Sequence, residues 1–207
     1  TSTHNLNVLG LSKMKKLEST LGNMVIVLTS VSLVAAGLLA VMNNLTSEPI
    51  ALQAKQKEDN GIKKVLCVSD AEQINVTKED KKVEDQLFSI YNVTNAEGTK
   101  IGAAVKTSVQ GFSPDLTVMV GFDNDGNVQG YEILNQSETP GLGANVPTWF
   151  QKEGKGNVIG MNPGKNNMTV KKDGGEVEAI TASTITSRAF LKAIDLEYNA
   201  LFDSKDA

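Results

Sequence analysis

The strongest hydropathy feature of the chain is one long apolar run near its N-terminus. No charged residue lies between Ser19 and Ser47, and the stretch from Met24 to Met42 is almost wholly apolar. A helix of this length crosses the hydrocarbon core of a bilayer, so the pattern predicts one transmembrane helix over 19–46. A cleaved signal peptide is the competing interpretation, but the run exceeds a typical signal-sequence core and no small-residue cleavage site follows it.

The segment after the apolar run is polar and weakly patterned as far as residue 85, and we expect it to form a stalk and surface segment over 47–85. Ser47-Glu48-Pro49 is typical of a helix start, which predicts a polar helix that runs through Lys57 and breaks at Asn60-Gly61. Residues 62–68 suit a further short helix or strand. Residues 69–85 are charged and indicate only a surface segment.

From Gln86 onward the apolar period changes to two, which is typical of strands with one buried face. Four β-rich runs are separated by turn residues, and two closing strands precede the last helix. The predicted strands are 87–93, 101–105, 116–122, 128–134, 168–172 and 177–180. A short helix is expected over 147–150. Together these elements predict an α+β domain over 86–207, with an antiparallel-rich sheet and flanking helices.

The turn Asp123-Asn124-Asp125-Gly126-Asn127 joins two of these strands and predicts a hairpin. A calcium loop is the alternative interpretation. Counted as an EF-hand from Asp123, however, the loop has Val128 where the glycine belongs and Leu134 where the bidentate glutamate belongs. The spacing therefore favours turn chemistry.

The apolar residues Phe190, Ile194, Tyr198 and Leu201 recur at helical spacing near the C-terminus and predict an amphipathic helix. Thr186 or Ser187 is its expected N-cap. Hydroxyl residues crowd ahead of this helix, in the run from Glu178 to Arg188. Because free N–H groups and the helix dipole favour anions there, the run suits a phosphate site. A strand, a cap and a helix without any ligand is the alternative that the residues alone leave open.

Composition removes several classes of function. The net charge of the 207 residues is −4, and the part after the apolar run is more acidic still, which argues against nucleic acid as a partner. One cysteine, Cys67, excludes an internal disulfide and a cysteine-rich metal site. One histidine, His4, argues against Ser-His-Asp catalysis and a zinc site. Without a second cysteine, Cys67 is expected to be inert.

Basic residues lie closely on one side of the apolar run. Lys13, Lys15 and Lys16 precede it, whereas the other side opens with Asn43 and Asn44. The positive-inside rule then predicts a cytoplasmic tail over 1–18 and an extracytoplasmic location for everything after the helix. Because Met14-Lys15-Lys16 would make a natural start, residues 1–13 are interpreted as an upstream extension or an added segment.

Ser137-Glu138-Thr139-Pro140-Gly141-Leu142-Gly143 forms a loop of unusual local chemistry after the fourth strand. Its glycines allow close approach of a backbone, and Pro140 stiffens the turn. Such a loop suits a flat ligand beneath it, although ordinary surface loops have similar compositions.

This loop and the run Thr181-Ala182-Ser183-Thr184 together resemble the covalently flavinylated FMN-binding domain family. The family includes the G subunit of the Rnf electron-transport complex and the C subunit of sodium-pumping NADH:quinone reductase. The first run matches the family's SETPGLG loop, and the second lies where the family has Ser/Thr-Gly-Ala-Thr. The membrane start around Met14–Thr29 and the segment Asn43–Ile50 are similar to the Rnf G subunit in particular.

The resemblance implies FMN esterified through its phosphate to Thr184, in a bond made by a separate magnesium-dependent flavin transferase. The sequence departs from the family at Glu178, Ala182 and Ser183, where the family has Asp, Gly and Ala. The further residues that the resemblance places at the cofactor are Thr181, Ala182, Ser183, Thr186, Ser187, Glu138, Thr139, Gly141, Leu142 and Gly143.

The implied function is that of a redox subunit in the membrane-bound, ion-translocating ferredoxin:NAD⁺ oxidoreductase, without catalysis of its own and with the other subunits as partners. The quinone reductase subunit is the nearest alternative. A cofactor-free, membrane-anchored binding domain is the alternative from another class, supported only by Asn-x-Ser/Thr triplets. These triplets begin at Asn44, Asn75, Asn92, Asn135 and Asn167.

Overall fold

The computed structural model describes residues 20–69, 71–83 and 85–202. The chain divides into a unit that ends at Leu52 and a unit that begins at Gln53. The predicted tail over 1–18 lies outside the described residues. The elements are α1 (Leu21–Val65), β1 (Ile74–Val83), β2 (Gln86–Asn95), β3 (Lys100–Val109), β4 (Leu116–Phe122), β5 (Val128–Asn135), the 3-10 turn η1 (Gly143–Asn145), α2 (Val146–Trp149), the 3-10 turn η2 (Lys171–Asp173) and α3 (Thr184–Phe202).

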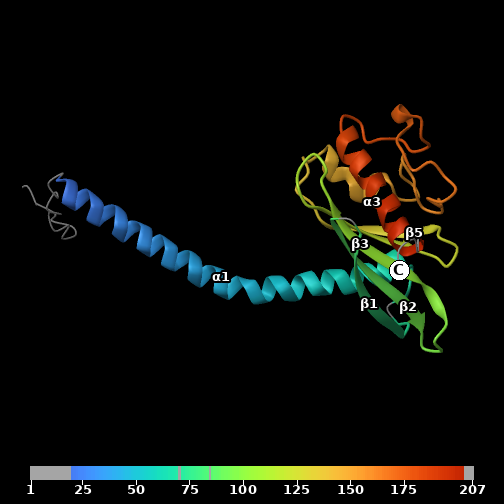
Figure 1. Ribbon diagram of the computed structural model, residues 1–207, viewed down its shortest axis with the longest axis horizontal. Coiled ribbons are helices and arrows are strands. Elements are labelled where there is room, and N and C mark those ends of the chain that lie inside the picture. The colour runs from blue at the N-terminus through green and yellow to red at the C-terminus, as the bar shows by residue number, and fades with distance from the viewer. Residues whose placement is uncertain (1–19, 70, 84, 203–207) are drawn as a thin grey trace, which may run out of the picture. The chain divides into compact units, whose positions relative to one another are not determined.

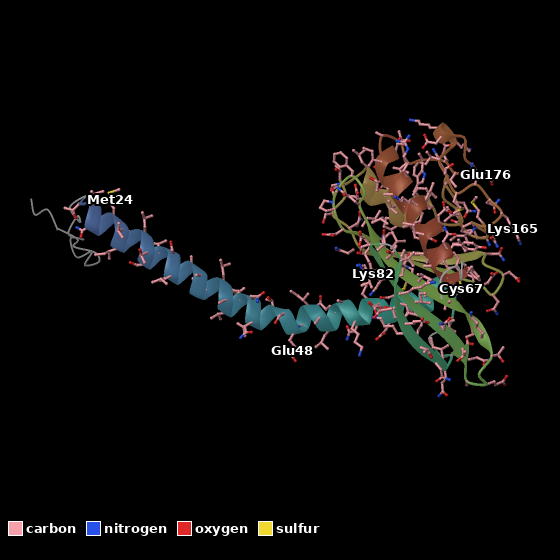
Figure 2. All side chains as sticks on the ribbon, viewed as in Figure 1. Met24, Glu48, Cys67, Lys82, Lys165 and Glu176 are labelled. Atoms are coloured by element: carbon pink, nitrogen blue, oxygen red, sulfur yellow. The ribbon has the colours of Figure 1, made fainter. Side chains whose placement is uncertain are left out.

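The first unit holds the apolar part of α1. This helix is long and apolar enough to cross a membrane, and its most apolar stretch is not buried by any described part of the chain. Figure 2 shows the side chains between Met24 and Glu48 pointing away from the helix on all sides. These features agree with the candidate membrane span that the hydropathy pattern predicts.

The helix α1 continues without a break through the predicted stalk, so the separate helix expected from residue 47 and its end at Asn60-Gly61 are wrong. Pro49 lies inside α1, where it removes one backbone hydrogen bond without ending the helix. Gly61 has a packing role, because a Cβ there would lie 3.2 Å from Met119 Sδ. The glycine lets the helix approach the sheet closely.

The second unit is built on a five-stranded antiparallel sheet in the order β1-β2-β3-β4-β5. The strands expected over 87–93, 101–105, 116–122 and 128–134 are confirmed as β2 to β5, and the hairpin pairs Phe122 with Val128. The edge strand β1 was not predicted. Nearly all of its residues are exposed and many are charged, so no alternation of apolar and polar positions marks it.

The two faces of the sheet are buried by different parts of the chain. Helix α3 packs mainly against β3 and β4, and is drawn in red beside β3 in Figure 1. The large core on this face also takes in the connection between β5 and α3, including Phe150 and Ile180. The opposite face carries a smaller core in which the end of α1, with Ile62 and Val65, packs against Tyr91 and Met119.

Two glycines of the sheet make the contact with the end of α1 possible. A Cβ at Gly121 would lie 2.2 Å from the Val65 carbonyl oxygen, and one at Gly130 would lie 2.9 Å from it. Beside them, Glu58 of α1 accepts hydrogen bonds from the Tyr91 hydroxyl and the Lys106 ammonium group. The end of α1 is therefore a fixed part of the second unit.

The connection between β5 and α3 contains little regular structure. The predicted short helix is confirmed as α2, but the two predicted closing strands are wrong. Only a single bridge forms, between Val170 and Val177, and η2 lies between the two residues. Gly174 adopts φ 86°, and the chain turns too tightly there for a ladder to continue.

Candidate functional site

The helix α3 begins at Thr184, earlier than predicted. The Ser183 carbonyl accepts the first bond of the helix, from Ser187 N at 3.1 Å, which makes Ser183 the N-cap residue. The predicted cap at Thr186 or Ser187 is therefore wrong, and both residues lie in the first turn. Ser187 instead holds the segment that precedes the helix, because its hydroxyl accepts from Ile180 N at 3.0 Å and donates to the Ser183 carbonyl at 2.9 Å.

A tight turn brings the chain to the helix. Ser183 N donates to the Ile180 carbonyl at 3.0 Å, and Ala182 between them adopts φ 57°. Glycine adopts this left-handed conformation more readily than any other residue, and the family that the sequence resembles has glycine at this position. Ala182 is therefore a strained residue next to the helix start.

A cavity of about 400 Å³ opens at this helix start. It brings together three segments that are distant in the sequence: the loop after β3, the loop after β5, and the first turn of α3. Its lining residues are Phe112, Glu138, Thr139, Leu142, Gly143, Ala182, Ser183, Thr184, Ile185 and Thr186.

Glu138 ties these three segments to one another. The side chain is 7% exposed, and its Oε1 accepts from Ser113 N at 3.1 Å while its Oε2 accepts from the Thr186 hydroxyl at 3.0 Å. Two glycines make room for it. A Cβ at Gly111 would lie 2.3 Å from Oε1, and one at Gly143 would lie 2.6 Å from Oε2.

The hydroxyl groups at the helix start differ in their surroundings. Thr186 is fully buried, and Ser183, which is 8% exposed, donates from Oγ to Thr186 Oγ1 at 3.1 Å. Thr184 is half-buried, and within the described residues its hydroxyl has no hydrogen-bond partner. Thr184 therefore presents a free hydroxyl at the cavity.

The helix start also provides positive electrostatic potential. Among the described residues, no acceptor bonds the backbone N–H groups of Thr184, Ile185 and Thr186. Since the first turn of a helix leaves such groups free and the helix dipole is positive there, the site favours an anion.

A second cavity, of about 250 Å³, adjoins the turn at Ala182 and is lined by Lys171, Lys172, Glu178 and Thr181, among others. Lys171 pairs with Glu178 at 3.2 Å. Arg188 on α3 binds Asp173 through two hydrogen bonds of 2.7 Å, and this contact lowers the pKa of the Asp173 carboxyl. These pairs hold η2 against the start of α3.

Three large apolar side chains remain exposed around the first cavity. Phe112 is 67% exposed, Leu142 38% and Ile185 53%. Each of them lines the cavity, and they come from all three of its segments. A rim of this kind suits a flat aromatic ligand that would cover the apolar side chains.

The structure brings most of the predicted site residues together, but not all of them. Thr181 lines the second cavity, Gly141 lies in an exposed turn at φ 77°, and Ser187 is buried beneath the helix start. Sequence reasoning missed Phe112 and Ile185. An aromatic residue in a loop between two strands was the available signal for Phe112.

The FMN-binding domain family model matches residues 111–196, a range that contains every residue of the cavity. These features identify residues 111–196 of the second unit as an FMN-binding domain. The site fits the cofactor, because the free N–H groups and the Thr184 hydroxyl suit a phosphate and the apolar rim suits a flavin ring.

Curated relatives extend the likeness over most of the chain. The G subunit of the ion-translocating oxidoreductase complex from Aliivibrio fischeri (strain ATCC 700601 / ES114) is 30% identical over 186 residues, covering 82% of this chain and 84% of its own. The protein of that name from Shewanella oneidensis is 31% identical over 176 residues, or 79% and 81% of the two chains. That from Methanosarcina acetivorans is 26% identical over 172 residues, or 82% and 88%. The chain belongs to the family of ion-translocating oxidoreductase complex G subunits, and is a flavin-binding electron-transfer subunit of the Rnf type.

Proposed function

We propose that this subunit carries its FMN covalently, through a phosphodiester bond to the Thr184 hydroxyl. The observation that carries the proposal is the free hydroxyl of Thr184 at the cavity, beside N–H groups of the first turn of α3 that have no acceptor among the described residues. A phosphodiester at this position keeps one negative charge, which the helix start stabilises.

The chain needs a separate flavin transferase to form this bond. A threonine hydroxyl is a weak nucleophile without an adjacent base. Glu138, the carboxylate that lines the cavity, has both oxygens engaged by Ser113 N and the Thr186 hydroxyl. The transferase therefore supplies the base, the metal ion and an activated flavin donor.

Bound FMN supplies transfer of electrons singly or in pairs. The residues of this chain hold and surround it. Thr184 would hold the phosphate end, and the exposed apolar side chains of Phe112, Leu142 and Ile185 at the cavity would cover the ring and exclude water from it. Glu138 keeps the loop after β5 joined to the helix start.

The proposed setting is the cell inner (plasma) membrane, with α1 as a single span. The lysines before the apolar run support a cytoplasmic N-terminus and an extracytoplasmic FMN domain. There the subunit passes electrons to and from other redox subunits of the ion-translocating ferredoxin:NAD⁺ oxidoreductase, and it performs no independent catalysis.

The attachment site is tested with Thr184→Ala in the full chain, co-expressed with the transferase. The wild type is expected to give a flavin-fluorescent band on a denaturing gel, and Thr184→Ala is expected to give none. Thr139→Ala is the matched control, because it removes a different threonine hydroxyl from the lining of the same cavity and should keep the band. A fluorescent Thr184→Ala band of wild-type intensity would refute the assignment, and a wild type without any flavin would favour the cofactor-free binding domain.

A further inference from the structure

We infer that Glu138 is a positioning residue that decides which hydroxyl of the run Thr181–Thr184 receives the flavin. The inference rests on the proposed covalent attachment. It concerns Ser183, whose hydroxyl directly precedes Thr184 in the sequence and lines the same cavity. Glu138 holds this hydroxyl in a hydrogen-bond chain and so keeps it from reacting with the flavin donor in place of Thr184.

The direction of each hydrogen bond in this chain is fixed by chemistry. A carboxylate can only accept, so Thr186 must donate its proton to Glu138 Oε2, at 3.0 Å. Thr186 Oγ1 is then left as an acceptor, and Ser183 donates to it at 3.1 Å. The Ser183 proton is thus directed into the core, whereas the Thr184 hydroxyl has no partner within the described part of the chain.

Attachment at either residue requires the same exchange of bonds. The hydroxyl oxygen forms a bond to the phosphorus of the FMN group, the pyrophosphate bond of the donor FAD breaks, and AMP leaves. The hydroxyl proton passes to a base on the transferase. Ser183 would first have to break its bond to Thr186 and rotate into the cavity, and Thr184 has no such bond to break.

Glu138→Gln reverses the chain with little change in shape. Ser113 N–H always donates, so it orients the amide with the oxygen toward Ser113 and the NH₂ group toward Thr186. Thr186 then accepts from the amide, and its own proton becomes available to donate to Ser183 Oγ. The Ser183 proton is then released toward the cavity and a base of the transferase, while the Ser183 oxygen still accepts the bond from Thr186.

The test uses the full chain with Thr184→Ala as background, the transferase, FAD and Mg²⁺, with peptide mass spectrometry to locate the flavin. Thr184→Ala alone is expected to leave Ser183 unmodified. Adding Glu138→Gln is expected to raise flavin on Ser183 above the level of Thr184→Ala alone, because Thr186 no longer holds the Ser183 proton although the two hydroxyls stay hydrogen-bonded. Adding Thr186→Val instead removes the hydrogen bond of Ser183 altogether and should raise flavin on Ser183 by at least about fivefold, the factor that corresponds to one net neutral hydrogen bond.

Thr186→Ser is the matched control, because it keeps the hydroxyl and the chain, and Ser183 should stay unmodified. The inference is overturned if Thr184→Ala alone is flavinylated on Ser183 as fully as the double variants. It is also overturned if folded double variants, checked by circular dichroism, show no gain while the wild type carries its flavin on Thr184. Wild-type protein that lacks flavin altogether contradicts the proposed function, and the two failures are therefore distinguishable.

Discussion

Glu197 on α3 is a buried carboxyl group that the flavin site does not use. Its side chain is fully buried, and neither of its oxygens has a hydrogen-bond partner among the described residues. Burial raises the pKa of Glu197 well above its ordinary value, against smaller opposing effects of the backbone at Thr107 and Val120. The folded state therefore keeps this group protonated in a pH range in which the unfolded chain ionises it.

The sign of the pH dependence follows from this raised pKa. Below the unfolded pKa of about 4.5, both states are protonated and Glu197 has no effect on the pH dependence. As pH rises above that value, the unfolded state is favoured, and each pH unit up to the folded pKa lowers the free energy of unfolding by about 1.4 kcal/mol. Glu197→Gln cannot ionise and should lose this slope.

Glu197→Met goes further, because it also removes the two unpartnered oxygens while it keeps a similar volume. We expect the free energy of unfolding to rise by about 2 kcal/mol, the cost of an unsatisfied buried polar group. Urea unfolding of the full chain in detergent, at several values between about pH 5 and pH 8, measures both effects. Burial raises the pKa of Asp195 to about 6. Asp195 is present in every variant, so it adds the same pH dependence to each of them.

Glu153→Gln makes the same chemical change at an exposed position and should leave the slope unaltered. If Glu197→Gln retains the wild-type slope, or if Glu197→Met lowers stability at every pH, the account of Glu197 as an unpaired, protonated group is wrong.

Three other predictions concern stability and packing. Ala182→Gly should raise the free energy of unfolding by about 1 kcal/mol, because φ 57° strains alanine. The control Ala144→Gly should lower the free energy of unfolding. If urea unfolding shows equal effects for the two variants, Ala182 is not strained. Gly121→Ala should lower the free energy of unfolding by at least about 2 kcal/mol, because its Cβ would lie 2.2 Å from the Val65 carbonyl oxygen. Amide hydrogen exchange at the end of α1 should become faster, and unchanged exchange would refute the contact. Lys106→Met should cost about 1.5 kcal/mol, because the partly buried Glu58 loses a charged hydrogen bond and keeps only the one from the Tyr91 hydroxyl. Lys64→Met, which breaks a more exposed pair, should cost under about 1 kcal/mol in the same measurement.

The sequence predicted the elements whose burial follows a local period. The strands β2 to β5 alternate or run apolar because their faces are buried, and 116–122 was predicted with the bounds of β4. The edge strand β1 was missed because its pairing with β2 depends on backbone hydrogen bonds, and these leave no pattern in exposed side chains. Long-range contacts also explain why Gly61 lies within α1 instead of ending it.

The parts of the candidate site that lie in a short sequence motif were predictable. The parts that only the folded chain brings together were not. The loop after β5 and the start of α3 were recognised by their motifs, and the structure places both at one cavity. The contribution of Phe112 depends on the path of the loop after β3, and the link from Glu138 to Thr186 spans 48 positions. Such partners are set by tertiary structure, which periodicity does not encode.

The most direct test of the central proposal is mass spectrometry of the full-length wild-type chain after co-expression with the flavin transferase. One adduct with the mass of FMN less one water is expected, and fragmentation should place it on the Thr184 side chain. A chain that stays unmodified beside an active transferase, or an adduct on any other residue, would contradict the account.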